Sequence, residues 1–593
     1  MQWLRTGMAV AAILSSAMCA RADSTWVAAG WVSGNWTSAG SPYVISDGWI
    51  RVHADSALMI QPGVEVYFAG PQAMLVFGRL TAVGTAQDSI HFVGANVDTL
   101  EDAWRGLVFM STDSTTADSS RLAYAVLKRA GGPGLLYGTG GAIQCLRASP
   151  RFDHCLLQNN RALRSRASQI VQSRLGGGVY LSHSDARFTN CEFTRNYPGP
   201  LGEGGALFCE DGGSSVFENC VMQNDTAALG GAVAIRNATD PNEYPTFHRC
   251  DISQNRAFFD GGGVHLDASH CYFDSCTINS NNSGQCGGGL YTIHDGTANF
   301  WKSEMAGNES FWGGAIYCCF SVSGPVLVSS LIHDNVAGYG GAVYSWRAHP
   351  VMAASTISRN TDTQDGGAAV YLNESEGILN STIVSHSVGG AGIFFRRSPL
   401  SVLQYCNVGA NDGAPYDFYP DESAKPYYYG EIMQTNANGD SCDLWYNLFQ
   451  DPRFAGGPGE DFHLNWDSPC INAGDPGSTH DPDGSVIDIG AFYRDAAAVD
   501  PERTAVRRYE LSQNYPNPFN SATRIEFDLP RAGEAELAVY DVTGRLVTTL
   551  LSGTLNEGHH NVNWDASHVP SGVYLYRLRT GDGVWAKKMI VLK

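Results

Sequence analysis

Residues 230–266, GGAVAIRNATDPNEYPTFHRCDISQNRAFFDGGGVHL, contain one full copy of a repeat that governs the middle of the chain. The tetrad Gly230-Gly231-Ala232-Val233 opens this copy, and the next copy opens 31 residues later. Between the two openings, Phe247 is followed after three residues by Cys250, and Asn255 comes five residues after the cysteine. Recurrence of such a pattern at a nearly constant interval is the sequence signature of a repeat architecture.

The Gly-Gly-small-aliphatic tetrad recurs at intervals of 23 to 36 residues, most often 26. The tetrads begin at Gly140, Gly176, Gly204, Gly230, Gly261, Gly287, Gly313, Gly340, Gly366 and, in degenerate form, Gly389. The apolar residues of the second element are Phe152, Phe188, Phe217, Phe247, Phe273, Phe300, Leu327, Met352, Ile378 and Leu403. The small residues are Cys155, Cys191, Cys220, Cys250, Cys276, Ser303, Ser330, Ser355, Ser381 and Cys406. The last column is Asn160, Asn196, Asn255, Asn281, Asn308, Asn335, Asn360 and Asn411, with Asp225 and His386 as exceptions.

These offsets predict a chain that turns several times in each unit. A strand alternates its faces every residue, so residues at odd separation share a side only if the chain bends between them. The apolar and small residues are at odd separation, as are the small residue and the asparagine. Asparagine tolerates left-handed backbone and bonds nearby amides, which suits a corner, and the glycine pair permits a third bend. Stacked units of this kind form a parallel β-helix, and the missing hexapeptide period favours the right-handed form.

The stacking also gives an interpretation of the cysteines. Equivalent positions of neighbouring coils lie about 4.8 Å apart and point the same way. We therefore expect the cysteine column to consist of small core side chains with free thiols, with a disulfide ladder as the alternative. Cys442 and Cys470, in a less regular region, are a better disulfide candidate.

The flanking segments complete the domain plan. Residues 23–135 are predicted to hold an N-terminal cap, with Trp26, Trp31 and Trp36, and the first coils. Residues 136–411 are the repeat coils, and residues 412–495 the terminal coils and their cap. The polar stretch 496–508 is expected to be a linker.

Composition and the first residues bear on location. The chain of 593 residues has 38 Lys+Arg and 59 Asp+Glu, a net charge of −21, which argues against a nucleic-acid partner. Residues 1–22 have the pattern of a signal peptide, with Arg5, a short apolar run and Ala20-Arg21-Ala22 before a cleavage at Asp23. A lipoprotein signal using Cys19 is the alternative. No later apolar run is long enough for a transmembrane segment.

The C-terminal part has a different pattern. Alternating segments such as Arg524–Leu529, Ala535–Tyr540 and Val573–Leu578 predict about seven short strands, a small Ig-like β-sandwich at residues 509–593. Its motifs, including Asn514-Tyr515-Pro516-Asn517-Pro518-Phe519-Asn520 and Ser571-Gly572-Val573-Tyr574, resemble the type A sorting domain of the type IX secretion system. The residues that carry the resemblance are Asn514, Pro516, Pro518, Phe519, Gly544, Trp564, Gly572, Tyr574, Lys588 and Lys593.

That resemblance implies a Gram-negative host, the type IX secretion machinery as a partner, and a product secreted or held on the outer-membrane surface. It implies no catalytic site. The repeat itself resembles polymorphic outer-membrane protein repeats, as in Gly313-Gly314-Ala315-Ile316 and Phe193-Thr194-Arg195-Asn196. Most copies lack that phenylalanine, so the similarity is to the wider class of right-handed β-helices. It implies fold and surface exposure.

Two sets of residues are candidate sites. The fourth residue after the first glycine of the tetrad is often aromatic and is predicted to face outward. These candidate ligand-binding residues are Tyr180, Phe208, His265, Tyr291, Tyr317 and Tyr344, with Ala234 interrupting the column. They either stack on sugar faces or pack beneath neighbouring loops, and we favour the packing. Asp475, Asp481, Asp483 and Asp488 have oxygen spacing that suits Ca²⁺, although turn capping by these carboxylates is favoured, and no other cofactor is expected.

Catalysis needs acids or a base that converge. Polar candidates on predicted outer faces are His183, Asp185, Glu210, Asp211, Arg236, Asp267, His294, Asp295 and Arg347. They belong to different coils and form no known motif, so a solvated face is the favoured interpretation. The leading hypothesis is a non-catalytic protein of adhesion or glycan binding on host or cell surfaces. The alternative is an extracellular polysaccharide lyase or hydrolase, which convergent carboxylates with an arginine would favour.

Overall fold

The computed structural model describes residues 24–95, 103–111, 120–131, 140–162, 175–364, 367–419, 428–455, 461–494, 509–556 and 558–593. It divides into two compact units, Met1–Tyr493 and Arg494–Lys593. The predicted signal peptide at residues 1–22 and the predicted linker at 496–508 lie outside the described residues. Each unit is described by itself.

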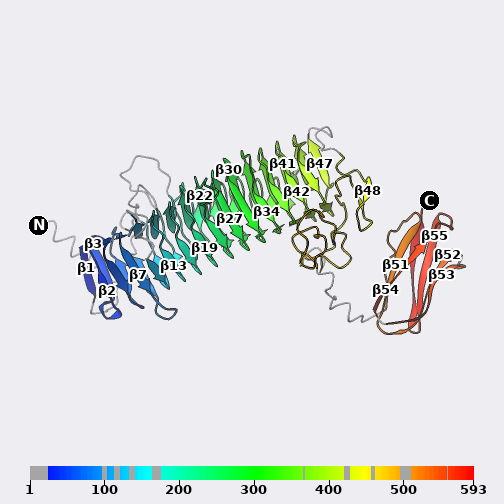
Figure 1. Cartoon of the computed structure of the whole chain (residues 1–593), viewed down its shortest axis with the longest axis horizontal. Helices are drawn as coiled ribbons and strands as arrows, with labels where there is room; N and C mark the ends of the chain where they lie inside the picture. The colour runs from blue at the N-terminus through cyan, green and yellow to red at the C-terminus, as the bar shows by residue number, and fades with distance from the viewer. Residues whose placement is uncertain are drawn as a thin grey trace. The chain divides into compact units, whose positions relative to one another are not determined.

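The first unit is a stack of coils whose parallel strands form long sheets along the coil axis (Figure 1). A 28-stranded sheet supplies two faces of the coil, which we call the first and third sheets, and a 14-stranded sheet supplies the second. The first sheet contains β1 (Thr25–Trp31), β3 (Tyr43–Val52), β6 (Met74–Val76), β9 (Leu107–Met110), β12 (Ile143–Leu146), β15 (Val179–Ser182), β18 (Leu207–Glu210), β22 (Val233–Arg236), β26 (Val264–Asp267), β30 (Leu290–Ile293), β33 (Ile316–Cys319), β37 (Val343–Trp346), β41 (Gly367–Asn373), β44 (Gly390–Arg396) and β47 (Tyr416–Tyr419). The strands from β12 to β44 follow the glycine tetrads, whereas the first four strands and β47 lie outside the repeats. The second sheet has 14 strands: β2 (Gly34–Trp36), β4 (Ala57–Ile60), β7 (Arg79–Val83), β10 (Arg121–Ala123), β13 (Arg151–Asp153), β16 (Arg187–Thr189), β19 (Val216–Glu218), β23 (Thr246–His248), β27 (His270–Asp274), β31 (Thr297–Trp301), β34 (Val326–Val328), β38 (Val351–Ala353), β42 (Ile378–Asn380) and β45 (Val402–Gln404).

The third sheet follows the second in each coil. Besides the first half of β3, it contains β5 (Glu65–Phe68), β8 (Ile90–Gly94), β11 (Ala125–Lys128), β14 (Leu156–Gln158), β17 (Glu192–Thr194), β20 (Val221–Gln223), β24 (Asp251–Ser253), β28 (Thr277–Asn279), β32 (Glu304–Ala306), β35 (Leu331–His333), β39 (Thr356–Ser358), β43 (Ile383–Ser385) and β46 (Asn407–Gly409). The turn that returns to the first sheet carries β21 (Thr226–Ala227), β25 (Arg256–Ala257), β29 (Asn282–Ser283), β36 (Val336–Ala337) and β40 (Thr361–Asp362). A 3-10 turn, Ser38–Gly40, is the one helical element among the described residues. The predicted parallel β-helix is therefore confirmed.

The inward columns have the predicted register. Phe188 pairs with Phe152 on one side and with Phe217 on the other, and their ring centroids are 4.5 and 5.0 Å apart. The stack continues through Phe247, Phe273 and Phe300 at 4.7 to 5.0 Å. Stacked rings of this kind remove large apolar areas from water along the whole solenoid. All these phenylalanines are buried.

The asparagine column forms a continuous ladder inside the coil. Oδ1 of Asn308 accepts hydrogen bonds from the backbone N–H of Asn281 at 2.9 Å and from its Nδ2 at 3.0 Å. Nδ2 of Asn281 also donates to the Ile252 carbonyl of the preceding coil, at 2.9 Å. The same pattern links Asn255 to Asn281 and Asn335 to Asn360. These bonds satisfy backbone groups at a buried corner, where unpaired groups would be costly.

Two details of the predicted corners were wrong. The residue in left-handed conformation is the one before the small residue or before the asparagine, such as Arg249 (φ 51°) and Gln254 (φ 58°), not the asparagine. The register also shifts by one residue near Ile378. Leu379, not Ile378, pairs with Met352, and Ile378 is 43% exposed. The small position of that coil is accordingly Thr382, and Ser387 takes the place that was predicted for His386.

All fourteen cysteines after Cys19 are free thiols in the structure, and thirteen of them are buried, Cys286 being intermediate. The cysteine column is in register: the backbone N–H of Cys250 lies 3.4 Å from Sγ of Cys276. Cys442 and Cys470 are both buried in one apolar cluster but are not bonded, so the disulfide predicted between them is absent. Sγ of Cys470 instead accepts a hydrogen bond from Asn407 Nδ2.

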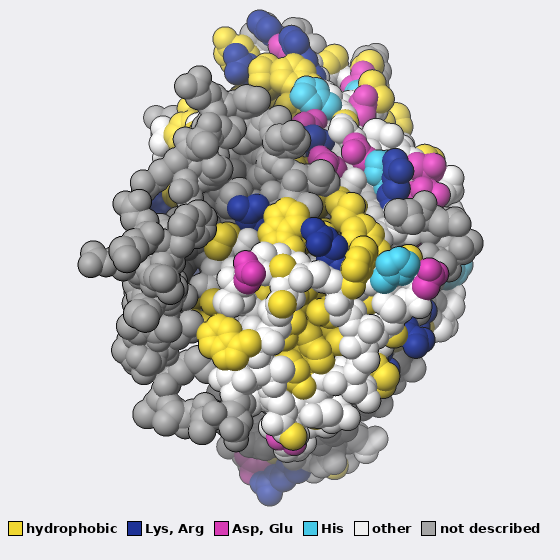
Figure 2. Space-filling view, turned by 90° about the vertical axis from the view of Figure 1, so that its left-hand side faces the viewer, with side chains coloured by type: hydrophobic (Ala, Val, Ile, Leu, Met, Phe, Trp, Pro, Cys, Tyr) yellow, Lys and Arg dark blue, Asp and Glu magenta, His cyan; other side chains and the backbone are white. Residues whose placement is uncertain are grey.

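The N-terminal end is only partly capped as predicted. Trp36 is buried and stacks on Tyr43 at 4.5 Å, but Trp26 and Trp31 are 59% and 61% exposed. Figure 2, which faces this end, shows hydrophobic side chains gathered on the described surface. Trp36 therefore covers the core end, whereas the other two tryptophans do not.

The closing segment does more than cap the last coil. Tyr416 and Tyr429 close the core, and β48 (Gln434–Thr435) and β49 (Ser441–Cys442) form a short hairpin beyond them. Residues 461–494 then return along the third sheet, where the Ala491 N–H donates to Thr356 Oγ1 at 2.9 Å. Cover by the closing segment explains why all three residues of β39, β43 and β46 are buried, while uncovered strands such as β24 bury only the central one.

The second unit is a two-sheet β domain, in agreement with the predicted sandwich. One sheet has the order β50 (Glu510–Leu511), β51 (Ala522–Leu529), β54 (Gly558–Asp565). The other has the order β53 (Leu546–Leu555), β52 (Gly533–Asp541), β55 (Gly572–Thr580), β56 (Gly583–Val591). The pairings are antiparallel, and both sheets contribute to a single apolar cluster.

Candidate functional site

The predicted aromatic column is buried. Each of Tyr180, Phe208, His265, Tyr291, Tyr317 and Tyr344 is less than a tenth exposed. Their rings stack on one another, for example Tyr291 on Tyr317 at 5.4 Å and Tyr317 on Tyr344 at 5.3 Å. The column continues through Tyr371 to Phe394. Because neighbouring rings occupy the ring faces, these six residues form a packed column and not an exposed stripe, and packing is the interpretation that the sequence pattern favoured over sugar binding.

The cover comes from the column directly before the glycine pairs, where Trp312 pairs with Tyr339. The Trp312 ring stacks on Tyr339 at 4.7 Å and meets Tyr344 edge-on at 5.1 Å. These side chains lean over the buried rings from the turn that enters the first sheet. Burial also lowers the pKa of His265 to about 4, so this ring is neutral at physiological pH.

Exposed aromatic rings lie in the same turn, at positions that the sequence analysis did not select. We define the aromatic edge as Phe258, Phe259, Phe311, Trp312 and Tyr339. Phe258, Phe259 and Phe311 are 39%, 40% and 46% exposed. Phe259 and Phe311 are two coils apart, about 10 Å, with exposed Gln285 on the coil between them. The sequence contains one signal for this surface: an aromatic residue stands two positions before the glycine pair at both Gly261 and Gly313.

The backbone holds the aromatic edge rigidly. The Gln285 N–H donates to the Phe259 carbonyl, and the Phe311 N–H donates to the Gln285 carbonyl at 3.0 Å. Phe311 contacts Trp312 edge-on at 5.0 Å. Arg256 lies with its guanidinium 5.7 Å from the Phe258 ring. The edge thus combines fixed ring faces with an amide and a cation, a combination typical of binding surfaces.

Several polar candidates of the first sheet converge around Arg236. Its Nη2 lies 2.5 Å from Glu203 Oε2, and its Nε lies 3.9 Å from Asp267 Oδ2. Asp267 in turn contacts His294 Nδ1 at 2.8 Å. Glu210 accepts a hydrogen bond from the Tyr180 hydroxyl, and burial raises the pKa of its carboxyl group. We call Glu203, Glu210, Arg236 and Asp267 the arginine cluster. Glu203 was missed because it precedes a glycine pair, in a column that is mostly apolar.

The other polar candidates do not join this cluster. Asp185 Oδ1 accepts from the Ser214 N–H, and Asp295 Oδ1 accepts from the Val322 N–H. Arg347 pairs with Glu374 at 2.7 Å. These contacts link neighbouring coils, as expected for a solvated face.

The four aspartates proposed for calcium bind backbone and side-chain donors. Asp483 Oδ1 accepts from the Ser485 N–H and hydroxyl, and Asp488 Oδ1 accepts from the Asn472 N–H. Asp481 Oδ2 accepts a hydrogen bond from the Asp488 N–H, and Asp475 Oδ2 accepts one from Nδ2 of Asn380, which belongs to the wall of the coil. No group of three or more His, Cys, Asp or Glu suited to a metal ion occurs within the described ranges. Calcium binding by these residues stays an untested prediction.

The sorting-domain residues mostly hold the second unit together. Asn514 is buried. Its N–H donates to the Tyr576 hydroxyl, and its Nδ2 donates to Thr523 Oγ1. Phe519 and Tyr574 both contact the Trp564 ring edge-on, at 5.7 and 5.8 Å. Pro516 O accepts from Thr523, and Pro518, like Pro516, follows a cis peptide bond.

The remaining sorting residues lie at turns and at the end of the chain. Gly544, with φ of 83°, lies in the turn between β52 and β53, and Gly572 begins β55. Lys593 Nζ donates to the Ser567 carbonyl at 2.6 Å. The side chain of Lys588 is exposed, and its carbonyl accepts a hydrogen bond from Gln513 Nε2.

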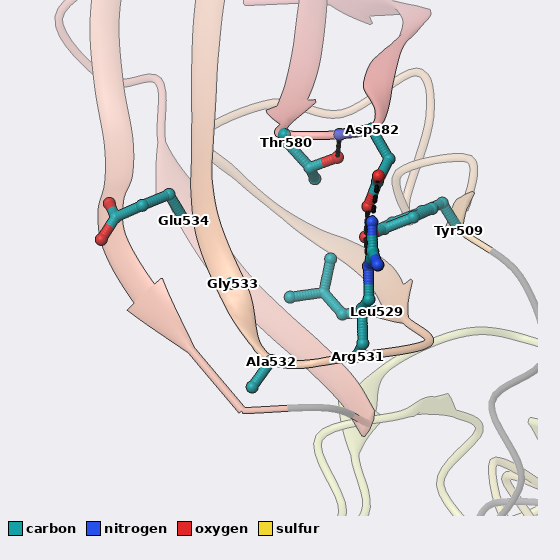
Figure 3. A pocket seen from close by; sticks show the side chains of 9 residues that line it. Tyr509, Leu529, Arg531, Ala532, Gly533, Glu534, Thr580 and Asp582 are labelled. Atoms are coloured by element: carbon teal, nitrogen blue, oxygen red, sulfur yellow. Dashed lines mark hydrogen bonds and ion pairs between the residues drawn. The ribbon is translucent and has the colours of Figure 1, made fainter.

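A pocket of about 300 Å³ lies at one end of the second unit (Figure 3). Arg531 Nε reaches Asp582 Oδ2 at 3.0 Å, and the Tyr509 hydroxyl donates to the same carboxylate. The hydrogen bond from Tyr509 and the pairing with Arg531 lower the pKa of Asp582. The polar groups of this pocket therefore bind one another and fasten the start of the domain to the β55–β56 turn.

None of the described residues belongs to a helix of the length and apolarity needed to cross a bilayer. Comparison with protein families gives two matches. Residues 136–310 and 177–361 match the model described as a right handed beta helix region, and residues 513–592 match the secretion system C-terminal sorting domain. No curated protein and no solved structure matches the chain.

Proposed function

Because the chain joins a right-handed β-helix to a C-terminal sorting domain of the type IX secretion system, we propose that it is an exported, non-catalytic protein that binds glycans at the aromatic edge. Export to the cell surface or the medium follows from the sorting domain. The binding role is supported by one observation: exposed, rigidly held rings repeat along the coil axis at Phe259 and Phe311. Adhesion to a glycan-coated surface would use the same contacts.

The chemistry of a sugar polymer suits this edge. Ring faces bind the C–H face of a pyranose, while nearby amides and cations bind its hydroxyl groups. Gln285 lies between the two exposed phenylalanines, and Arg256 lies beside Phe258. The net charge of −21 also favours neutral glycans over anionic polymers at long range.

The test is a panel of polysaccharides with the full exported chain and the double variant Phe259→Ala/Phe311→Ala. We expect loss of each ring to weaken binding about tenfold, about 1.4 kcal/mol. Phe320→Ala is the matched control, because Phe320 is also exposed (42%) but lies in a different turn. Equal binding by the double variant and the wild type would contradict the proposal.

A second candidate function, polysaccharide cleavage, is supported by the arginine cluster. Three carboxylates and an arginine converge there, and burial raises the pKa of Glu210, as a general acid requires. The competing explanation is a structural ion-pair network, since Arg236 is already paired twice. Release of reducing ends or unsaturated products, abolished by Glu210→Gln, would establish the enzyme. If no polymer yields a product, the cleavage function is contradicted and the binding function remains the proposal.

A further inference from the structure

A cavity lies where the returning segment 461–494 meets the solenoid, and neither the sorting domain nor the aromatic edge explains it. Its volume is about 390 Å³. One wall is formed by Lys302, Glu304 and Leu331 of the coils, and the other by His463, Phe492 and Tyr493 of the returning segment. We call it the return cavity. Its volume lies near the lower end of the range of small-ligand sites and suits a single sugar ring.

The returning segment supplies flat rings to the cavity. His463 stacks on Phe492 with centroids 4.4 Å apart and planes inclined by 26°. His463 Nδ1 is held by Asp461 Oδ1 at 2.6 Å, which fixes the imidazole in place. Tyr493 is 44% exposed beside this pair. Exposed ring surface that lines a cavity suits the apolar face of a saturated sugar.

The two charged residues of the cavity walls, Glu304 and Lys302, differ in whether an oppositely charged group binds them. Glu304 is bound by His333 Nε2 at 3.2 Å, a hydrogen bond that lowers the pKa of the carboxyl group. Burial opposes protonation of His333, but its bonds to Glu304 and Asp334 outweigh this and raise its pKa. The negative charge of Glu304 is thus largely compensated by the wall itself.

Lys302 has no such compensation. It lies at a left-handed corner (φ 48°) between β31 and β32, with its side chain exposed. Its contact is the Trp301 ring, 5.8 Å from Nζ, and it forms no ion pair within 4.0 Å with any described residue. A cation without a carboxylate, beside aromatic walls, is complementary to a ligand that carries both an anion and a ring.

We infer that the return cavity binds a carboxylated sugar unit, with the carboxylate on Lys302 and the ring against Phe492 and Tyr493. This site is distinct from the aromatic edge, which has no exposed lysine, and it adds a preference for an acidic glycan to the proposed neutral binding. The arrangement needs the returning segment in place, because half of the walls belong to it.

The experiment is calorimetric titration of the full exported chain with trigalacturonate and with its methyl ester, which keeps the rings but removes the charge. We expect the acid to bind at least tenfold more tightly than the ester. Lys302→Gln should abolish that preference, and Lys302→Arg should retain it. Lys128→Gln, at the other lysine of the described coils, is the matched control and should change nothing.

A second variant tests the ring wall. Phe492→Ala should weaken the acid and the ester alike, because both ligands keep the ring. Equal affinity of the wild type for both ligands, no binding of either, or an unchanged preference in Lys302→Gln would overturn the inference. The double variant Phe259→Ala/Phe311→Ala should bind trigalacturonate normally, so failure of the aromatic edge and failure of the return cavity are separable.

Discussion

Oδ1 of Asp225 accepts hydrogen bonds from both the backbone N–H (2.6 Å) and Nδ2 (3.0 Å) of Asn196, while its Oδ2 is buried with no hydrogen-bond partner. In the next rung, the equivalent atom is Nδ2 of Asn255, which donates to the Met222 carbonyl at 2.9 Å. A carboxylate in that place has no proton to donate. Burial raises the pKa of Asp225 well above its ordinary value, so the folded state holds a proton on this group more tightly than the unfolded state does.

We expect Asp225→Asn to stabilise the solenoid by about 1–3 kcal/mol at pH 8, because it restores the missing donor. The folded pKa is raised, so the folded state holds a proton that the unfolded state releases above about pH 4. The stabilisation from this proton is complete below pH 4 and is lost as pH rises toward the folded pKa. Unfolding temperatures measured from pH 4 to pH 8 should therefore fall more steeply in the wild type than in the variant.

The reverse substitution provides the control for the ladder. Asn255→Asp removes the donor to Met222 and to Asn281 and should destabilise the protein, with the same sign of pH dependence. Parallel pH profiles of Asp225→Asn and wild type would show that Asp225 does not titrate as described.

The buried ring column should act in stability rather than in binding. Tyr317→Ala removes a ring stacked on both sides, so we expect a loss of about 3–5 kcal/mol in urea unfolding. Tyr317→Phe keeps the ring and serves as the control. If Tyr317→Ala kept its stability but lost glycan binding, the column would be a ligand surface after all.

Thiol chemistry should report the packing of the cysteine column. Cys318, Cys406 and Cys470 are buried, and burial raises the pKa of each thiol to about 12. These thiols are therefore not ionised at pH 8. We expect the native protein to react with iodoacetamide at no more than about one site, Cys286, and the unfolded mature protein at all fourteen. Mass spectrometry reads out both numbers. Cysteines that remain unlabelled after unfolding without reductant would reveal disulfides.

The sorting residues should separate into two groups. Phe519→Ala opens a cavity beside Trp564 and should cost about 3–5 kcal/mol, a large part of the stability of a small domain. Export should fall with it, while the solenoid stays folded in the cell. Lys588→Ala changes an exposed side chain and should leave the unfolding of the domain within about 0.5 kcal/mol of wild type.

Secretion of both variants is measured as the fraction of protein outside the cell. Normal export of Phe519→Ala would show that the folded sandwich is not what the machinery requires. A destabilised Lys588→Ala would show that its side chain has a structural role.

The regular part of this fold could be predicted from sequence because every coil must place equivalent residues on the same axis. The columns that contain Phe188 and Asn281 are fixed by spacing alone. Where spacing was irregular, the prediction slipped: Ile378 was selected, although Leu379 points inward, because both are aliphatic and the interval shortens there. A period of two assigns opposite faces to adjacent residues, so a shift of one residue exchanges the inside for the outside.

The candidate site was harder to predict for a different reason. Periodicity predicts correctly that Tyr317 points away from the interior of the coil. It cannot predict that Trp312 and Tyr339, from the turn before the glycine pair, lie over that column. The return of residues 461–494 along the third sheet also depends on contacts between distant segments, such as that between Thr356 and Ala491. The return cavity therefore has no signature in local sequence.

The contact between Thr356 and Ala491 spans 135 positions of the chain. Coils near the N-terminus can close as soon as their own neighbours are present in the compartment where the chain folds, since each depends on adjacent segments only. The coil that carries Thr356 is finished only when the polypeptide is present almost to the start of the sorting domain. The solenoid is thus completed at nearly the same time as the sorting domain appears. A fully assembled solenoid without its sorting domain therefore exists only briefly.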